Sequence, residues 1–237
     1  MHSDYSTFWI VIVSSVILLV IYSVFFIEFN RKSKSIGYKN NATFVYLQRL
    51  TGVITFGIFP LGIMKYMLPT GLSDYGTELT MPYKSLLWFV ILSVIIIPLN
   101  FSQAKKEANL KVYPQIRINN WGTGVFAMSA VTWTLYLLAY EFFFRGFLLF
   151  GILDVVGPYW AVAINTALYA IAHIPKGKFE TLGAIPLGIL LCIITFTTGS
   201  FWVAFGMHVV MALSNEWFSL YYHKEMKITF LSKSGTN

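Results

Sequence analysis

The stretch FWIVIVSSVILLVIYSVFFI, residues 8–27, is an uninterrupted apolar run near the amino terminus. It has about the 20 residues that a helix needs to cross the hydrocarbon core of a bilayer. It lacks the basic first segment and the small-residue cleavage site of a signal peptide, so we interpret it as a membrane helix.

Six more apolar runs follow, at roughly residues 43–67, 85–101, 127–156, 159–175, 181–198 and 200–222. The chain is 57% hydrophobic and only 11% charged, whereas a soluble domain has about a quarter of charged residues. We therefore predict an all-α, polytopic membrane helix bundle with seven transmembrane helices in a lipid bilayer. The alternative is an eight-span arrangement, in which the long fourth run is split near residue 140.

The basic residues support the seven-span arrangement. Of the 17 Lys and Arg residues, thirteen fall on one side of the membrane in this arrangement, and only Lys84 falls on the other. Such a bias marks the cytoplasmic side, so we expect the amino terminus outside and the carboxyl terminus in the cytoplasm. The net charge of +7 is then explained by the basic residues of the cytoplasmic loops, and no nucleic-acid partner is expected. The thirteen are Arg31, Lys32, Lys34, Lys39, Lys105, Lys106, Lys111, Arg117, Lys176, Lys178, Lys224, Lys227 and Lys233.

The fourth run contains two opposite charges in the stretch YEFFFRGF, residues 140–147. Glu141 and Arg145 are four residues apart, which places them on one face of a helix. A charge in the middle of a bilayer costs a few kcal/mol or more, so it is normally paired and usually functional. A structural ion pair that locks two helices together is the other interpretation.

Two histidines accompany this pair. Gly157–Pro158 predicts a turn, and Glu141 and His173 lie equally far from it along two neighbouring helices, about 24 Å at 1.5 Å per residue. They should therefore reach a similar depth. His208 lies in the last run, and Asn215 shares its helix face. Counted from the start of that helix, Asn215 matches the depth of Glu141 better than His208 does.

A buried carboxylate and two imidazoles are the groups needed to activate water and to stabilise an oxyanion. They predict hydrolysis of an amide by water inside a membrane. We find no serine or cysteine placed as a nucleophile, and Cys192 has no evident base. No cofactor is required. A divalent metal such as zinc is compatible with one Glu and two His, although the close HExxH pairing is absent.

These residues resemble the CPBP family of intramembrane proteases, named for CAAX prenyl proteases and bacteriocin-processing enzymes and also called the Abi family. The family pattern is EExxxR, then FxxxH, then HxxxN or HxxxD. In this chain YEFFFRG supplies Glu141 and Arg145, YAIAH supplies His173, and TTGSFWVAFGMH supplies His208. The similarity covers about residues 128–215.

The resemblance implies a glutamic endopeptidase that needs no nucleophilic side chain. Glu141 would be the base, His173 would help to hold the water, Arg145 would orient Glu141, and His208 would donate to the oxyanion. The chain departs from the pattern at Tyr140, where the first Glu is expected, and at Ala212, where Asn or Asp is expected. We hypothesise that Asn215 supports the oxyanion in place of the missing third-motif amide.

The resemblance also implies three regions. These are amino-terminal membrane helices with basic cytoplasmic loops (1–121), a CPBP-like catalytic helix bundle (122–223) and a short basic cytoplasmic tail (224–237). The substrate would be a membrane-associated peptide or protein, either lipidated or carrying a leader or a carboxyl-terminal sorting segment. We expect the protein in the cell membrane of a bacterium or an archaeon.

Two other functions are weighed against the protease. A catalytically weakened or inactive membrane scaffold, immunity or regulatory protein would explain Tyr140 and Ala212. A transporter could use Arg49 and Glu216 to line a polar pathway, but the duplicated broken helices of many transporters are absent. We expect Arg49 to pair with an acidic residue across the bundle.

Overall fold

The computed structural model describes residues 2–36, 41–69, 71–79 and 82–229, and over these residues the protein is an all-α bundle, as predicted. The amino-terminal part contains α1 (His2–Ile36), α2 (Asn41–Val53), the π-helix η2 (Ile54–Ile58), α3 (Phe59–Met67), the short η3 (Leu72–Tyr75), α4 (Pro82–Ala104) and α5 (Glu107–Leu110). The carboxyl-terminal part contains β1 (Asn120–Gly122), α6 (Thr123–Glu141), the π-helix η4 (Phe142–Leu148), α7 (Leu149–His173), η5 (Ile174–Lys176), α8 (Lys178–Thr198), α9 (Trp202–Tyr222) and β2 (Lys227–Thr229).

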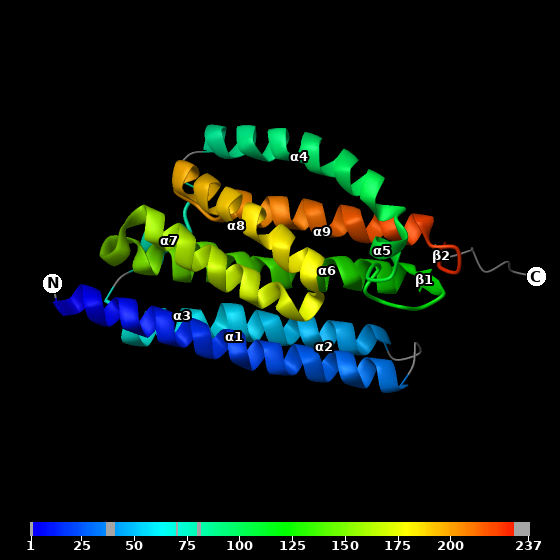
Figure 1. Cartoon of the computed structure of the whole chain (residues 1–237), viewed down its shortest axis with the longest axis horizontal. Helices are drawn as coiled ribbons and strands as arrows, with labels where there is room; N and C mark the ends of the chain where they lie inside the picture. The colour runs from blue at the N-terminus through cyan, green and yellow to red at the C-terminus, as the bar shows by residue number, and fades with distance from the viewer. Residues whose placement is uncertain (1, 37–40, 70, 80–81, 230–237) are drawn as a thin grey trace, which may run out of the picture.

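The long helices run along the longest axis of the molecule (Figure 1). In that view α1, α2 and α3 form one layer, α6 and α7 lie in the middle, and α4, α8 and α9 form the opposite layer. The closest helix pairs are α4 with α9, α7 with α8, and α2 with α6. Helices α6, α7, α8 and α9 therefore meet at the centre of the bundle, where the candidate site lies.

The surface of the bundle is apolar. Five helical segments are long and apolar enough to cross a membrane, namely 5–33, 41–67, 82–104, 123–176 and 178–198. In α4 only 11% of the most apolar window is buried, and Leu86, Val90 and Val94 are exposed. A helix that is apolar on all sides and faces outward is stable in lipid and not in water. The protein is thus an integral, multi-pass membrane protein.

The chain passes through residue 140 without a turn. Helices α6, η4 and the first part of α7 form one continuous helix, and the backbone of Glu141 and Phe142 is helical. The eight-span alternative required a turn at this place, and the structure has none there. The chain turns instead at Gly157, whose φ of 75° and ψ of 167° suit glycine and break α7 into two helices. The predicted turn at Gly157–Pro158 is therefore present.

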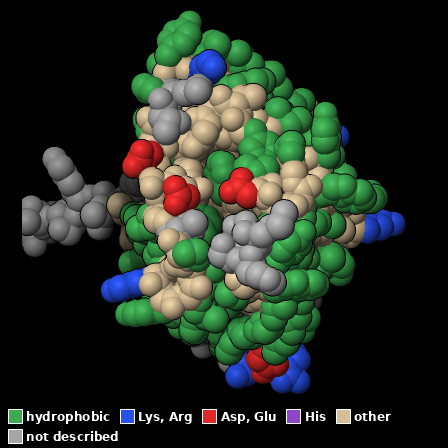
Figure 2. Space-filling model, turned by 90° about the vertical axis from the view of Figure 1, so that its left-hand side faces the viewer, with side chains coloured by type: hydrophobic (Ala, Val, Ile, Leu, Met, Phe, Trp, Pro, Cys, Tyr) green, Lys and Arg blue, Asp and Glu red, His purple; other side chains and the backbone are tan. Residues whose placement is uncertain are grey.

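The two ends of the bundle differ in the charged side chains that they expose. Figure 2 views the end that holds the amino terminus, where acidic side chains gather among apolar ones. The exposed acidic residues of this end are Asp74, Glu78 and Asp154. The other end, with α5 and the ends of α4 and α9, exposes Lys105, Lys106, Lys111 and Lys224.

The segment after α9 is partly folded onto the bundle. Lys227–Thr229 forms β2, which pairs in parallel with β1, with Trp121 opposite Ile228. This pairing ties the start of the predicted tail to the start of α6. Residues 230–237, which include Lys233 and most of that tail, lie outside the described residues, as does Lys39.

Candidate functional site

A cavity of about 460 Å³ lies between α4, α6, α8 and α9. One face of α6 forms a wall of the cavity with Trp133, Tyr136, Leu137 and Tyr140. Both candidate histidines, Asn215 and Ala212 also line it. Toward α5 the lining becomes polar, with Asn100, Gln103, Asn109, Lys176 and Glu180. The cavity therefore leads from a polar end near the basic loops to the buried histidines.

Glu141 is fully buried and is not part of the cavity wall. Its Oε1 atom lies 2.6 Å from Nδ1 of His208 on α9, and its Oε2 atom lies 3.4 Å from Nη1 of Arg145. Successive residues of a helix point about 100° apart, so Tyr140 faces the cavity while Glu141 faces His208 and Arg145. The carboxylate thus reaches the cavity only through His208.

Arg145 lies within the π-helix η4 and is also fully buried. Its guanidinium lies 4.2 Å from the centre of the Tyr169 ring, which is a favourable position for a cation. Among the described residues its nitrogens form no hydrogen bond of good geometry, although Glu141 Oε2 is within ion-pair distance. The stack on Tyr169 and the contact with Glu141 therefore hold the guanidinium in place.

His173, at the end of α7, is fixed by its Nδ1 atom. This atom lies 2.8 Å from the backbone carbonyl oxygen of Tyr169. A carbonyl oxygen only accepts hydrogen bonds, so Nδ1 of His173 carries the hydrogen. In the neutral ring the other nitrogen, Nε2, then has a free lone pair. His173 is thus prepared to accept a proton.

His208 is fixed in the same way by a charged partner. Its Nδ1 atom donates to the Glu141 carboxylate, which leaves Nε2 for a group in the cavity. A carboxylate stabilises a positively charged ring, whereas the carbonyl partner of His173 is neutral. The two imidazoles therefore differ in their partners: Nδ1 of His208 faces a carboxylate, and Nδ1 of His173 faces a neutral carbonyl oxygen.

Tyr140 lies between the two imidazoles. Its ring centre is 6.1 Å from that of His173 and 5.8 Å from that of His208. Its hydroxyl oxygen is 3.4 Å from Nδ1 of His173. In the sequence, Tyr140 is recognisable only as the replacement of a Glu of the family pattern. The sequence does not predict its place between the two histidines. Neither apolar spacing nor charge could have indicated it.

The predicted site residues thus fall into three groups. Glu141, Arg145 and His208 form one connected cluster. His173 borders the same cavity, on the other side of the Tyr140 ring. Asn215 lies on the cavity wall two helical turns from His208, which is about 10 Å along the axis of α9.

The prediction that Asn215 matches the depth of Glu141 better than His208 is wrong. The contact between His208 and Glu141 shows that these two residues meet directly. Counting residues from a turn assumes straight helices that start at equal heights, and tilted helices do not obey that assumption.

Asn165, which the sequence analysis did not single out, supports the π-helix. Its Nδ2 donates to the carbonyl oxygen of Phe144 at 2.5 Å, and its Oδ1 lies 3.3 Å from the Cys192 sulfur. A π-helix shifts the backbone hydrogen-bond pattern and can leave a carbonyl without its usual partner. Asn165 supplies that partner beside Arg145. An amide in the middle of an apolar run was the available signal.

The loop between α5 and β1 covers part of the cavity. The Tyr113 hydroxyl donates to Oε1 of Glu180 on α8 at 3.0 Å, and its ring stacks on Trp133 with centres 6.2 Å apart. Burial, followed by the nearby Glu180 carboxylate, raises the pKa of Tyr113 well above its ordinary value, so the hydroxyl stays protonated and donates. This bond joins the loop to α8 across the polar end of the cavity.

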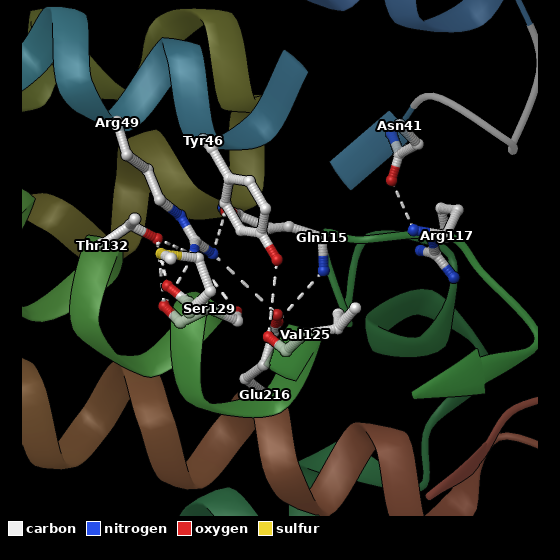
Figure 3. Close-up of polar contacts among 10 residues, drawn as sticks. Asn41, Tyr46, Arg49, Gln115, Arg117, Val125, Ser129, Thr132 and Glu216 are labelled. Carbon is white, nitrogen blue, oxygen red and sulfur yellow. Dashed lines mark hydrogen bonds and ion pairs between the residues drawn. The ribbon is translucent and has the colours of Figure 1, made fainter. Parts of the chain in front are cut away.

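A second buried charge cluster lies nearer the basic end (Figure 3). Arg49 of α2 donates to the Ser129 carbonyl at 2.8 Å and to Gln115 Oε1 at 3.0 Å, and also contacts the Thr132 hydroxyl at 3.1 Å. Its Nη2 lies 3.9 Å from Glu216 Oε1. The prediction that Arg49 pairs with an acidic residue across the bundle is confirmed. A transport pathway would need these groups to face a channel, whereas here they bind one another.

Within the described part of the chain, no group of three or more His, Cys, Asp and Glu side chains is arranged to hold a metal ion.

The carboxyl-terminal part of the chain, which contains the cavity histidines, is similar to a known protein family. Residues 119–214 match the family model of the type II CAAX prenyl endopeptidase Rce1-like proteins. No curated protein and no solved structure matches the chain significantly. The matched stretch contains both histidines and the Glu–Arg pair, and its similarity to the CAAX prenyl endopeptidases agrees with the resemblance found in the sequence.

Proposed function

We propose that this protein is an intramembrane endopeptidase that hydrolyses a peptide bond in a membrane-associated peptide or protein. At the level of the family, the match supports a CAAX-type endopeptidase with a membrane-associated protein substrate. The observation that carries the proposal is the pair of imidazoles on one cavity, His173 and His208, each with its Nδ1 atom fixed and its Nε2 atom available.

The two histidines divide the reaction between them. His173 Nε2 takes a proton from water while the water oxygen forms a bond to the substrate carbonyl carbon. The carbonyl π electrons move to its oxygen, and His208 Nε2–H stabilises the resulting oxyanion. The oxyanion then collapses, the C–N bond breaks, and the proton held by His173 passes to the amide nitrogen. The products are a carboxylic acid and an amine, and no oxidant or covalent enzyme intermediate is needed.

Glu141 acts through His208 in this proposal. The resemblance gave Glu141 the role of the base, and that role remains a prediction. The carboxylate is fully buried and contacts His208 and Arg145, which favours a role in orienting His208 and stabilising its charged form. Arg145 keeps the role of orienting Glu141.

The charges at the two ends of the bundle support a proposed orientation in the membrane. We propose that the end with Lys105, Lys106 and Lys111 faces the cytoplasm, because basic loops remain on that side. Asn100 and Gln103, at the end of α4, line the polar end of the cavity. A substrate would then enter from the cytoplasmic side.

A non-catalytic membrane scaffold is the second candidate. It is favoured by Tyr140 and Ala212, which line the cavity where the family pattern has acidic or amide side chains. The reactive arrangement of His173 and His208 favours the enzyme.

The two candidates are separated by a cleavage experiment. The purified protein in lipid nanodiscs is incubated with a library of peptides derived from bacterial membrane proteins, and mass spectrometry identifies cut peptides. Wild type is compared with His173→Ala and His208→Ala. His223→Ala serves as the control, because His223 lies at the end of α9 near Arg117 and does not line the cavity.

We expect the same cut peptides with wild type and His223→Ala, and a rate at least about 10²-fold lower with the two cavity variants. A wild-type protein that cuts no peptide would support the scaffold. Equal cutting by all four proteins would show that the activity does not come from this cavity.

A further inference from the structure

Among the described residues, the hydroxyl hydrogen of Tyr140 has no acceptor. Its oxygen lies 3.4 Å from Nδ1 of His173, but the hydrogen on that nitrogen already points to the Tyr169 carbonyl at 2.8 Å. The Tyr140 oxygen can therefore only accept from His173. Within the described part of the chain, the hydroxyl has no other hydrogen-bond contact, and no bond joins it to the Glu141 carboxylate, which contacts His208 and Arg145.

The hydroxyl is also held in a fixed position. The Tyr140 ring packs against Phe56, Phe144 and Tyr169, with ring centres 5.5, 4.7 and 5.7 Å away. The residue is 2% exposed and lines the cavity. A buried hydroxyl normally has an acceptor, because leaving one unmade costs about 1–3 kcal/mol. The acceptor for this hydrogen must come from the cavity.

Resting on the proposed function, we infer that the Tyr140 hydroxyl donates a hydrogen bond to the oxyanion of the tetrahedral intermediate. It does so beside His208, whose ring centre is 5.8 Å from the Tyr140 ring. A rigid donor aimed at a developing negative charge needs no reorganisation during the reaction, and this is the main source of its catalytic effect.

This role accounts for both departures from the family pattern at once. An ionised glutamate at position 140 could accept a proton but could not donate one, whereas a phenol donates. Ala212 lines the cavity but has no polar group to offer an oxyanion. In this protein the donor missing at position 212 is thus supplied from position 140. The base missing at position 140 is supplied by His173.

The test compares Tyr140→Phe with wild type on the peptide that wild type cuts fastest in the library. Phenylalanine keeps the ring packing and removes only the hydroxyl. Tyr22→Phe is the matched control, because Tyr22 is a buried tyrosine of the same aromatic cluster, 4.6 Å from Phe56, and does not line the cavity. Thermal unfolding of each variant is measured in parallel.

We expect Tyr140→Phe to lower kcat about 10²-fold, as the loss of one oxyanion donor does, with KM changed by less than about twofold. Tyr22→Phe should keep the wild-type kcat. Wild-type kcat in Tyr140→Phe would overturn the role of Tyr140 alone. Equal losses in both variants would assign the effect to packing and overturn it too. A wild type that cleaves nothing contradicts the proposed function, and the role of Tyr140 falls with it.

Discussion

Arg49 and Arg145 are both buried arginines that pair with a glutamate, yet their surroundings differ. Arg49 donates hydrogen bonds to Ser129, Thr132 and Gln115 and joins α2 to α6 and α9. Arg145 forms no hydrogen bond of good geometry among the described residues, and its cluster ends in His208 on the cavity wall. The Arg49 cluster has several hydrogen bonds, and neither Arg49 nor Glu216 lines the cavity.

On the proposed function, the difference separates a structural charge pair from a reactive one. A buried charge is expensive, so a cluster with many hydrogen bonds and no contact with the cavity chiefly fixes how helices pack. A cluster that includes a titratable imidazole facing a cavity can move a proton instead. The cost of a charge in lipid therefore indicates that the residue has a role. Only the contacts around the charge indicate whether that role is structural or catalytic.

The largest predicted effect is on stability. Arg49→Met should lower the free energy of unfolding by about 4 kcal/mol, because it leaves the buried Glu216 carboxylate without its ion-pair partner. Arg145→Met should cost about half as much, because Nδ1 of His208 still donates to the Glu141 carboxylate. Unfolding in mixed micelles with increasing dodecyl sulfate measures both. A greater loss in Arg145→Met would contradict the comparison.

A smaller effect is expected at Gln115, which bonds Arg49 through its side chain and Glu216 through its backbone. Gln115→Ala removes only the side-chain bond and should cost about 2 kcal/mol, the usual value for a bond to a charged group. Gln103→Ala, an exposed glutamine near the same end, should change stability by less than about 0.5 kcal/mol. The same unfolding assay measures both variants. Equal losses of stability in Gln115→Ala and Gln103→Ala would mean that the bond to Arg49 does not cause the loss.

The smallest effect is expected at Asn215. Because about 10 Å of helix separates it from His208, it should not reach the same oxyanion. Asn215→Ala should therefore lower kcat less than about tenfold in the peptide assay. A loss of about 10²-fold or more would favour the hypothesis drawn from the sequence, in which Asn215 replaces the missing amide of the third motif.

Much of this arrangement could be predicted from the sequence. Long apolar runs form helices in lipid because every backbone group must be bonded internally, so the helical bundle followed from composition. Gly157–Pro158 marked the turn after the fourth run. The spacing of Glu141 and Arg145 predicted their contact. The family motifs identified His173 and His208 as candidate site residues.

The directions of the side chains could not be predicted. One helical position changes a direction by about 100°, so whether Tyr140 or Glu141 faces the cavity depends on how α6 is rotated against its neighbours. The π-helix and the bond from Asn165 that supports it depend on packing between helices. Helix tilt likewise decided that His208, and not Asn215, meets Glu141.

One measurement tests the distinction between the two clusters directly. Glu141→Gln and Glu216→Gln each leave a buried arginine without its carboxylate, so both should lower stability. Peptide cleavage is measured at a temperature where both variants remain folded. We predict that Glu141→Gln lowers kcat about 10²-fold, because His208 loses the carboxylate that accepts from its Nδ1 atom and orients its ring toward the oxyanion. Glu216→Gln should stay within about twofold of wild type. Equal losses of kcat in the two variants would contradict the account.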